Sequence, residues 1–213
     1  MSKKLVSHPV FARFYARVSP SMERGGVADH RRQLLAGLSG RVIEVGAGNG
    51  LNFGHYPPEV THVVAVEPEG YLRAIAQQSA QVAPTSVEVI DGVADQLPAG
   101  DGSFDAAVAS LMLCSVTDQD TALREMFRVI RPGGQLRFFE HVRADTSGLY
   151  RFQRLLDATV WPALGGGCHA SRDTAAAIDN AGFTLQRLDH LRFPDTRFPL
   201  PTSPHILGVA SRP

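Results

Sequence analysis

A glycine-rich turn directly after a short apolar segment is the feature that most constrains the fold of this chain. Gly46, Gly48 and Gly50 follow residues 42–45, which read as a buried strand. Glycine has no Cβ atom, so such a turn lets the backbone approach a bound ligand closely. Glu67 ends a second predicted strand about 20 residues beyond the turn, where α/β folds place an acid that binds ribose hydroxyls. Together they predict a nucleotide-like cofactor at the carboxyl ends of parallel strands.

Strands and helices are predicted to alternate through the middle of the chain. Short apolar runs mark the strands, and a run rich in Ala and Gln marks the first helix between them. This alternation predicts a parallel sheet with helices on both faces. The elements expected here are strands at residues 42–45, 62–67, 87–90, 104–110 and 135–141, and helices at residues 71–82 and 118–130.

The two ends of the chain depart from this alternation. Residues 1–38 read as two helices that break at Pro20 and at the pair Gly25 and Gly26. Ser171 is predicted to cap a later helix, which Gly182 ends. The remaining expected elements are an inserted helix within residues 142–170, final strands at residues 183–190 and 205–210, and a Pro-rich loop between those strands.

The spacing of the glycines separates two kinds of cofactor site. The dinucleotide fingerprint is G-x-G-x-x-G, whereas residues 46–50 read G-x-G-x-G and position 51 is Leu. Residues 42–50 resemble motif I of the class I S-adenosylmethionine-dependent methyltransferases, in the form of the type 11 methyltransferase domain. Residues 92–105 resemble the segment before the fourth strand of that family, and residues 131–134 resemble the turn before its fifth strand.

This resemblance implies S-adenosylmethionine as the cofactor. It implies that the turn binds the methionine part, that Glu67 binds the ribose, and that a backbone amide near Ala94 binds adenine. Val93 stands where the family most often has an acid, and Asp95 or Asp91 can substitute for it. The implied cofactor-binding residues are Glu44, Gly46, Ala47, Gly48, Gly50, Asn52, Glu67, Pro68, Val93, Ala94, Asp95 and Leu111.

The expected fold is α/β: a Rossmann-like seven-stranded, mostly parallel sheet with helices on both faces and a C-terminal antiparallel strand. Residues 1–213 are expected to form a single methyltransferase domain. Within it, residues 1–40 form an N-terminal helical cap, residues 41–141 the cofactor-binding core and residues 142–213 the acceptor-side half.

A narrower resemblance concerns the acceptor of the methyl group. Residues 52–57, 113–116, 139–142, 167–168 and 204–208 resemble segments of the thiol S-methyltransferases in the methyltransferase-like group. This implies S-methylation of a small thiol. Transfer to O, N or C of a small aromatic or lipid-like metabolite stays open. So do an NAD(P)-dependent oxidoreductase and a binding module without catalysis.

Two histidines are the candidates for catalysis. His141 and His205 are predicted at strand ends on the acceptor side, and histidine has a pKa suited to deprotonating a thiol near neutral pH. A hydrogen-bonded structural role explains each of them equally well. Aromatic residues outside the core motifs suggest an apolar acceptor pocket, namely Phe11, Phe14, Tyr15, Phe152, Trp161, Phe193 and Phe198.

The charge balance and the cysteine content of the chain limit the kinds of partner, location and metal site that can be expected. Lys plus Arg number 21, as do Asp plus Glu, so binding to nucleic acid is not expected. No apolar run reaches about 18 residues, so no membrane anchor is expected. Cys114 and Cys168 form no CxxC pair, which favours a reducing, cytoplasmic location. A metal site of Cys168, His169 and Glu140 is conceivable but has no supporting ligand spacing, so no metal is expected. The expected partner is a small acceptor, such as an apolar thiol, bound to a monomer or homodimer.

Overall fold

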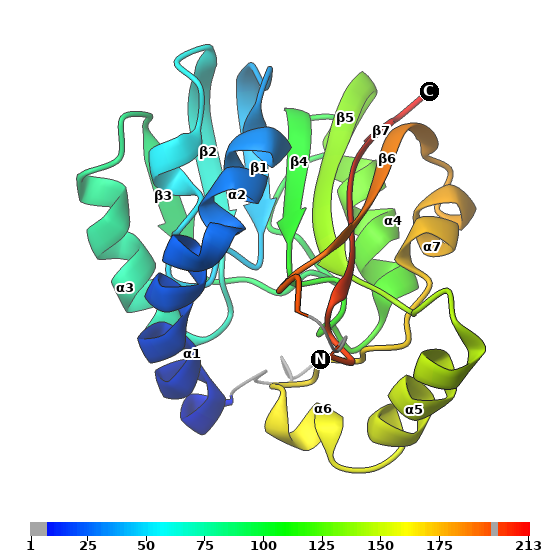
Figure 1. Ribbon diagram of the computed structural model, residues 1–213. Coiled ribbons are helices and arrows are strands. Elements are labelled where there is room, and N and C mark those ends of the chain that lie inside the picture. Colours follow the sequence, from blue (N-terminus) through cyan, green and yellow to red (C-terminus); the bar gives the residue numbers. More distant parts are fainter. Residues whose placement is uncertain (1–7, 197–199) are drawn as a thin grey trace.

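The structure is a computed structural model that describes residues 8–196 and 200–213, with a seven-stranded sheet at its centre (Figure 1). The strand order is β3-β2-β1-β4-β5-β7-β6, and only the two pairs that involve β7 are antiparallel. The expected Rossmann-like sheet with a C-terminal antiparallel strand is therefore confirmed. The strands are β1 (Gly40–Val45), β2 (Val60–Val66), β3 (Val87–Ile90), β4 (Phe104–Ser110), β5 (Ile130–His141), β6 (Thr184–Arg192) and β7 (Pro204–Ser211).

Helices cover both faces of the sheet. One face packs against α2 and α3, and the other packs against α4 and α7. Figure 1 shows α5 and α6 beyond the edge toward which the arrowhead of β4 points. The helices are α1 (Pro9–Met22), the π-helical η1 (Glu23–Val27), α2 (Ala28–Leu35), the 3-10 turn η2 (Phe53–His55), α3 (Gly70–Gln81), α4 (Gln119–Val129), α5 (Ser147–Asp157), α6 (Trp161–Leu164) and α7 (Thr174–Asn180).

Strand β1, in the interior of the sheet, contributes to both hydrophobic cores. Val42 belongs to the cluster that contains Leu34 of α2, whereas its neighbour Ile43 belongs to the cluster that contains Met126 of α4. Successive side chains of a strand point to opposite faces, so a strand covered on both sides is apolar along its length. The sequence Val42 to Val45 meets this requirement except at Glu44, which is buried with polar partners described below.

Of the two breaks predicted in the N-terminal helices, the one at the glycine pair occurs and the one at Pro20 does not. α1 continues through Pro20, so the predicted break at that proline is wrong. The chain changes direction at Gly26, whose φ of +118° suits glycine and few other residues. The predicted break at the glycine pair is therefore confirmed, and it places α2 on the sheet while α1 lies beside α3.

Two other local predictions need correction. Asp173, not Ser171, caps α7, because its carboxylate accepts a hydrogen bond from the backbone N–H of Ala176. The Ser171 hydroxyl already donates to Asp157 at 2.6 Å. The fifth strand begins at Ile130 rather than at residue 135, because Ile130 pairs with Phe104 of β4, and Gly133 and Gly134 form backbone hydrogen bonds with Arg212 after β7.

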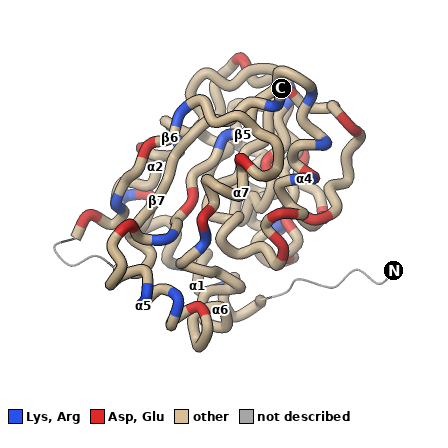
Figure 2. The backbone as a smooth tube through the Cα atoms, turned by 90° about the vertical axis from the view of Figure 1, so that its right-hand side faces the viewer, with Lys and Arg blue, Asp and Glu red and all other residues tan. Residues whose placement is uncertain are grey.

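Figure 2 shows Lys and Arg interspersed with Asp and Glu along the backbone. Several form ion pairs across the surface. Arg128 pairs with Asp101 and Glu125, each at 2.7 Å, and Arg131 pairs with Asp105 at 2.6 Å. The positive charges of Arg128 and Arg131 are thus compensated locally.

Candidate functional site

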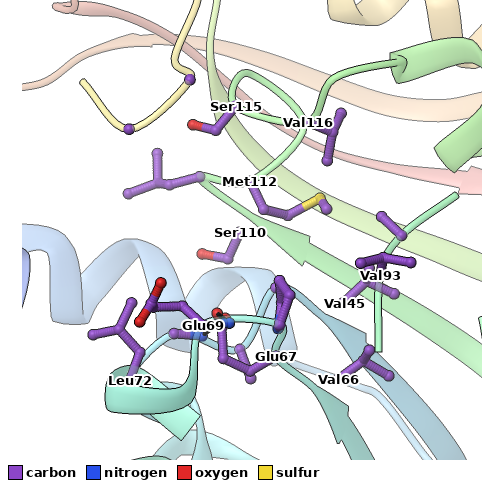
Figure 3. A pocket seen from close by; sticks show the side chains of 18 of the residues that line it. Val45, Val66, Glu67, Glu69, Leu72, Val93, Ser110, Met112, Ser115 and Val116 are labelled. Atoms are coloured by element: carbon purple, nitrogen blue, oxygen red, sulfur yellow. Dashed lines mark hydrogen bonds between the residues drawn. The ribbon is translucent and has the colours of Figure 1, made fainter. Parts of the chain in front are cut away.

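A cavity of about 390 Å³, here the central cavity, lies beyond the carboxyl ends of β1, β2 and β4. The turn after β1, the acid after β2 and the segment after β4 all border it. Figure 3 shows Glu67 and Glu69 on one side and Ser115 and Val116 on the opposite side, with Met112 between them. The parallel topology therefore brings the predicted cofactor residues to one place, except Gly50 and Asn52, which do not border the cavity.

The glycine-rich turn forms one wall. Gly46 and Gly48 border the cavity and have φ values of +71° and +58°, a region that side chains rarely adopt. A Cβ atom on Gly46 would lie 2.7 Å from the Cβ of Met112, so only glycine lets the turn approach the segment after β4. Gly50 has another function: it does not border the cavity, and a Cβ there would lie 2.6 Å from the ring of Phe53.

Glu67 presents a fixed carboxylate to the cavity. Its Oε2 accepts a hydrogen bond from the Gly48 N–H at 2.7 Å, and its Oε1 accepts one from the Glu69 N–H at 2.9 Å. Burial raises the pKa of Glu67. The two backbone donors orient the carboxylate, which keeps acceptor capacity for the hydroxyls of a ligand. Pro68, the next residue, also borders the cavity.

The loop before β4 also forms part of the cavity wall. Val93, Ala94 and Asp95 all border the cavity. Asp91, the other acid considered from the sequence, instead forms an ion pair with Arg73 at 3.0 Å. Asp95 is therefore the acid of the two that is placed to substitute for the missing one at Val93.

A buried polar network lies behind the turn. Glu44 accepts hydrogen bonds from Asn52 Nδ2 at 2.8 Å and from the Tyr56 hydroxyl at 2.7 Å. Burial raises the pKa of Glu44 from 4.5 to about 7. Arg31 of α2 donates to Asn52 Oδ1 at 2.8 Å and to Ser110 Oγ at 3.1 Å. Glu44 and Arg31 border the cavity, whereas Asn52 supports both from behind.

The segment after β4 forms the opposite wall. Leu111 borders the cavity and has a φ of +56°, which is a strained conformation for a side chain with a Cβ. The Glu140 carboxylate, fully buried at the end of β5, accepts from the backbone N–H groups of Met112, Leu113 and Cys114 at 2.9, 2.9 and 3.3 Å. One carboxylate therefore fixes the course of the whole segment.

Two of the predicted aromatic residues border the cavity. Phe11 and Tyr15 project from α1, and Phe11 contacts Gly166 of the loop after α6. The others lie elsewhere: Phe14 and Phe152 are largely exposed, Trp161 donates to Cys168 Sγ, Phe193 packs against His205, and Phe198 lies outside the described residues.

Comparison with known proteins identifies the family. Residues 43–138 match the model of a methyltransferase domain. The human thiol S-methyltransferase TMT1A is 36% identical over 184 residues, which cover 84% of this chain and 74% of that protein. The human thiol S-methyltransferase TMT1B is 37% identical, over 83% of this chain and 73% of that protein. The chain belongs to the thiol S-methyltransferase family of class I methyltransferases. Its cofactor is therefore S-adenosylmethionine, as the glycine spacing predicted.

Solved structures confirm the fold of this methyltransferase. An S-adenosylmethionine-dependent methyltransferase from Thermotoga maritima has a TM-score of 0.71 at 22% identity, over 96% of this chain and 98% of that one. A geranyl diphosphate methyltransferase in complex with its cofactor has a TM-score of 0.70 at 14% identity, over 98% and 94%. No helix in the described part of the methyltransferase is long and apolar enough to cross a membrane.

The two predicted catalytic histidines lie together but outside the lining of the central cavity. His141 and His205 oppose each other in the β5–β7 register and are both buried. His141 Nε2 lies 3.0 Å from Cys168 Sγ, and His205 donates from Nδ1 to the Ser203 carbonyl at 2.9 Å. Burial lowers the pKa of His205 to about 4. Catalysis by either histidine stays a prediction.

Other residues border the cavity without having been predicted to bind the cofactor or the acceptor, among them His8, Arg31 and His169. Arg31 comes from α2, and only the packing of the N-terminal helices places its side chain at the cavity. The aromatic pattern of α1 was the one signal that pointed to this cover.

Proposed function

We propose that this methyltransferase transfers the methyl group of S-adenosylmethionine to the sulfur of a small, largely apolar thiol. The observation that carries the proposal is the extent of the match to the human thiol S-methyltransferases. It spans 184 residues, whereas the methyltransferase domain model spans only residues 43–138. The likeness therefore includes segments outside the cofactor core, where an acceptor site is built.

The residues present fit the cofactor. The close approach of Gly46 to Met112 and the positive φ of Gly48 leave backbone, not side chain, at one wall. Glu67 would accept hydrogen bonds from the ribose hydroxyls, and the loop of Val93 and Ala94 would border the adenine. Arg31, a permanent cation at the buried polar end, would bind the carboxylate of the methionine part.

The protein has little covalent chemistry to perform. Bound S-adenosylmethionine would supply an activated methyl group: a thiolate sulfur would bond to the methyl carbon in line as the bond to the sulfonium sulfur breaks, and S-adenosylhomocysteine would leave as a neutral thioether. A thiol with an ordinary pKa near 8.5 is a few per cent thiolate at neutral pH, so a strong base is not required. The walls then act by excluding water and aligning the acceptor.

The acceptor side suits an apolar thiol. Phe11, Met112 and Val116 border this part of the cavity, and His169 and Ser115 add polar groups beside them. We assign His169 to the orientation of the acceptor through a hydrogen bond. The replacement His169→Asn should raise the KM for the acceptor and leave the affinity for S-adenosylhomocysteine within about twofold. An unchanged KM would exclude this assignment.

The alternative to S-methylation is transfer of the methyl group to carbon, oxygen or nitrogen of another small acceptor. A ubiquinone/menaquinone biosynthesis C-methyltransferase of Vibrio cholerae is 26% identical over 75% of this chain and 65% of that protein. Related chains with these motifs thus include one named for transfer to carbon. Incubation with S-adenosylmethionine and matched panels of thiols, phenols, amines and quinol analogues would decide. Turnover of thiols supports the proposal, and turnover of any other class with none of thiols refutes it.

A cofactor control separates the enzyme from the remaining alternatives. Calorimetry should show binding of S-adenosylhomocysteine and none of NADH. Cofactor binding without turnover of any acceptor would favour a binding module.

We further propose a cytoplasmic location, because both cysteines are free and buried, as is usual in a reducing compartment.

A further inference from the structure

Three potential metal ligands converge behind the acceptor side of the cavity. Cys114 comes from the segment after β4, His141 from the end of β5 and Cys168 from the loop after α6. Their ligand atoms all lie within 4.8 Å of one another, and all three side chains are buried. Cys168 Sγ lies 3.0 Å from His141 Nε2 and accepts a hydrogen bond from Trp161 Nε1 at 3.1 Å.

Hydrogen bonding alone does not account for this cluster. His141 Nδ1 has no hydrogen-bond partner in the described part of the structure, although the side chain is only 8% exposed. Such an unpaired buried group is unusual and calls for an explanation. The Nε2 atom faces a thiol, which is a weak hydrogen-bonding group. A cation bound by Nε2 and the two sulfurs would replace these weak contacts with coordinate bonds, while Nδ1 would carry the ring proton and would still have no hydrogen-bond partner among the described residues.

We propose that Cys114, His141 and Cys168 form a binding site for a thiophilic divalent cation, with Zn²⁺ as the ion of best fit. Two sulfurs and one imidazole nitrogen are preferred zinc ligands. Zinc bonds of about 2.3 Å to sulfur and about 2.0 Å to nitrogen place tetrahedral ligand atoms about 3.5 to 3.8 Å apart. The ligand atoms of the cluster need to move by no more than about 1 Å to reach that spacing.

The charge of the site balances on binding. Each thiol releases its proton to solvent and coordinates as thiolate, so Zn²⁺, two thiolates and a neutral imidazole sum to zero. The charged groups that act on the cluster or on its neighbours are the buried Glu140 and the half-buried Asp157 and Arg172, which carry both signs. Glu140 accepts from the Cys114 N–H, and Arg172 donates to the Val116 carbonyl at 2.7 Å. With three protein ligands, the fourth position is left for water.

The sequence could not reveal this site. The sequence analysis expected no metal because no ligands recur at a short spacing along the chain. The ligands of this site come instead from three separate segments, at positions 114, 141 and 168. The conceivable trio with His169 and Glu140 does not form, because Glu140 accepts from three backbone N–H groups and His169 borders the cavity. The ion would join two segments whose neighbouring residues, Ser115 and Gly167, border the cavity.

Metal binding by the intact protein tests the proposal directly. The metal-free protein, with both thiols reduced, is titrated with Zn²⁺ and with Co²⁺. We expect one ion per chain and, for Co²⁺, thiolate-to-metal charge-transfer absorption. Since Cys114 and Cys168 are the two cysteines of the chain, this absorption reports on them alone. A folded, reduced protein that binds neither ion stoichiometrically, or binds Co²⁺ without that absorption, overturns the proposal.

Matched variants locate the site. Cys114→Ser, Cys168→Ser and His141→Asn should each weaken Zn²⁺ binding by more than about 100-fold, beyond the 10- to 100-fold loss typical of an outer-shell partner. His205→Asn is the control, because its ring lies 6.0 Å from that of His141 and is no ligand. Circular dichroism checks that each variant folds. Full Zn²⁺ affinity in folded Cys114→Ser and His141→Asn would refute the assignment.

A second readout links the ion to the acceptor wall. Removal of the ion should raise the KM for a thiol while the Kd of S-adenosylhomocysteine stays unchanged. This readout depends on the proposed function, whereas metal stoichiometry does not. Failure of thiol turnover with intact Zn²⁺ binding would therefore refute the function and leave the metal site standing.

Discussion

Replacement of Glu44 by glutamine measures what it costs to bury a carboxylate beneath the central cavity. Burial raises the pKa of Glu44 from 4.5 to about 7. At about 1.4 kcal/mol per pH unit, this difference corresponds to about 3 kcal/mol in the free energy of unfolding. The folded pKa lies above the unfolded one, so the folded state binds the proton more tightly. This stabilisation is complete below about pH 4.5 and is lost as the pH rises through about 7.

Glutamine has nearly the same shape and stays neutral at every pH. Its amide oxygen can accept from Asn52 while its NH₂ group donates to the Tyr56 oxygen, as a protonated Glu44 would. Urea unfolding of the wild type and of Glu44→Gln between pH 4 and pH 8 gives the difference in unfolding free energy. The wild type should lose about 3 kcal/mol relative to the variant across this range.

Comparison with an exposed acid shows whether burial is the cause. Glu59→Gln changes one carboxylate on the surface and should give a nearly constant difference over the same pH range. The reasoning is refuted if the Glu44→Gln difference is also constant. It is refuted equally if the wild type gains stability relative to Glu44→Gln as the pH rises, because the sign would then be that of a lowered pKa.

Three further replacements probe the walls of the cavity. Gly48→Val places a branched side chain at a φ of +58° on the cavity wall, so calorimetry should detect no binding of S-adenosylhomocysteine; binding within twofold of wild type would contradict the placement of the cofactor. Arg31→Met removes charged hydrogen bonds worth about 1.5 to 3 kcal/mol, so the Kd of S-adenosylhomocysteine should rise about 10- to 100-fold, and an unchanged Kd would exclude Arg31 as the carboxylate partner. Glu140→Ala leaves three buried N–H groups unpaired at about 1 to 3 kcal/mol each, so denaturant unfolding should show a loss of about 3 kcal/mol or more, and a loss below 1 kcal/mol would be incompatible with those hydrogen bonds.

The sequence predicted the cofactor half of the fold well because its signals are local. β3 and β4 occupy the predicted residues 87–90 and 104–110, since each is a short apolar run with polar or turn residues at its ends. The glycine spacing of the turn and Glu67 after β2 are likewise read directly from the chain. The parallel topology then brings these segments together without further information.

Other parts of the site depend on packing that no local pattern reports. Arg31 reaches the cavity because the chain turns at Gly26 and lays α2 on the sheet. His141 and His205 were placed correctly at neighbouring strand ends, but the loop that carries Cys168 lies against His141. His141 is covered by a segment more than 20 residues away in the sequence. The sequence therefore predicted the two histidines at strand ends but not the residues that cover them.

The arrangement of these histidines has a consequence for the pH dependence of turnover. Neither borders the cavity, and His169, which does, is assigned to the orientation of the acceptor, so the thiolate is expected to form by ionisation of the acceptor itself. In that case kcat/KM rises about tenfold per pH unit below the pKa of the acceptor, and the plateau moves with that pKa between thiols. Glu44 titrates in the same range, so the profile should be repeated in Glu44→Gln, where only the dependence on the acceptor remains. A plateau at one fixed pH for thiols of different pKa would instead indicate a base in the enzyme. That base would be His169 at the cavity, or His141 or His205 through a conformation that opens the wall between them and the cavity.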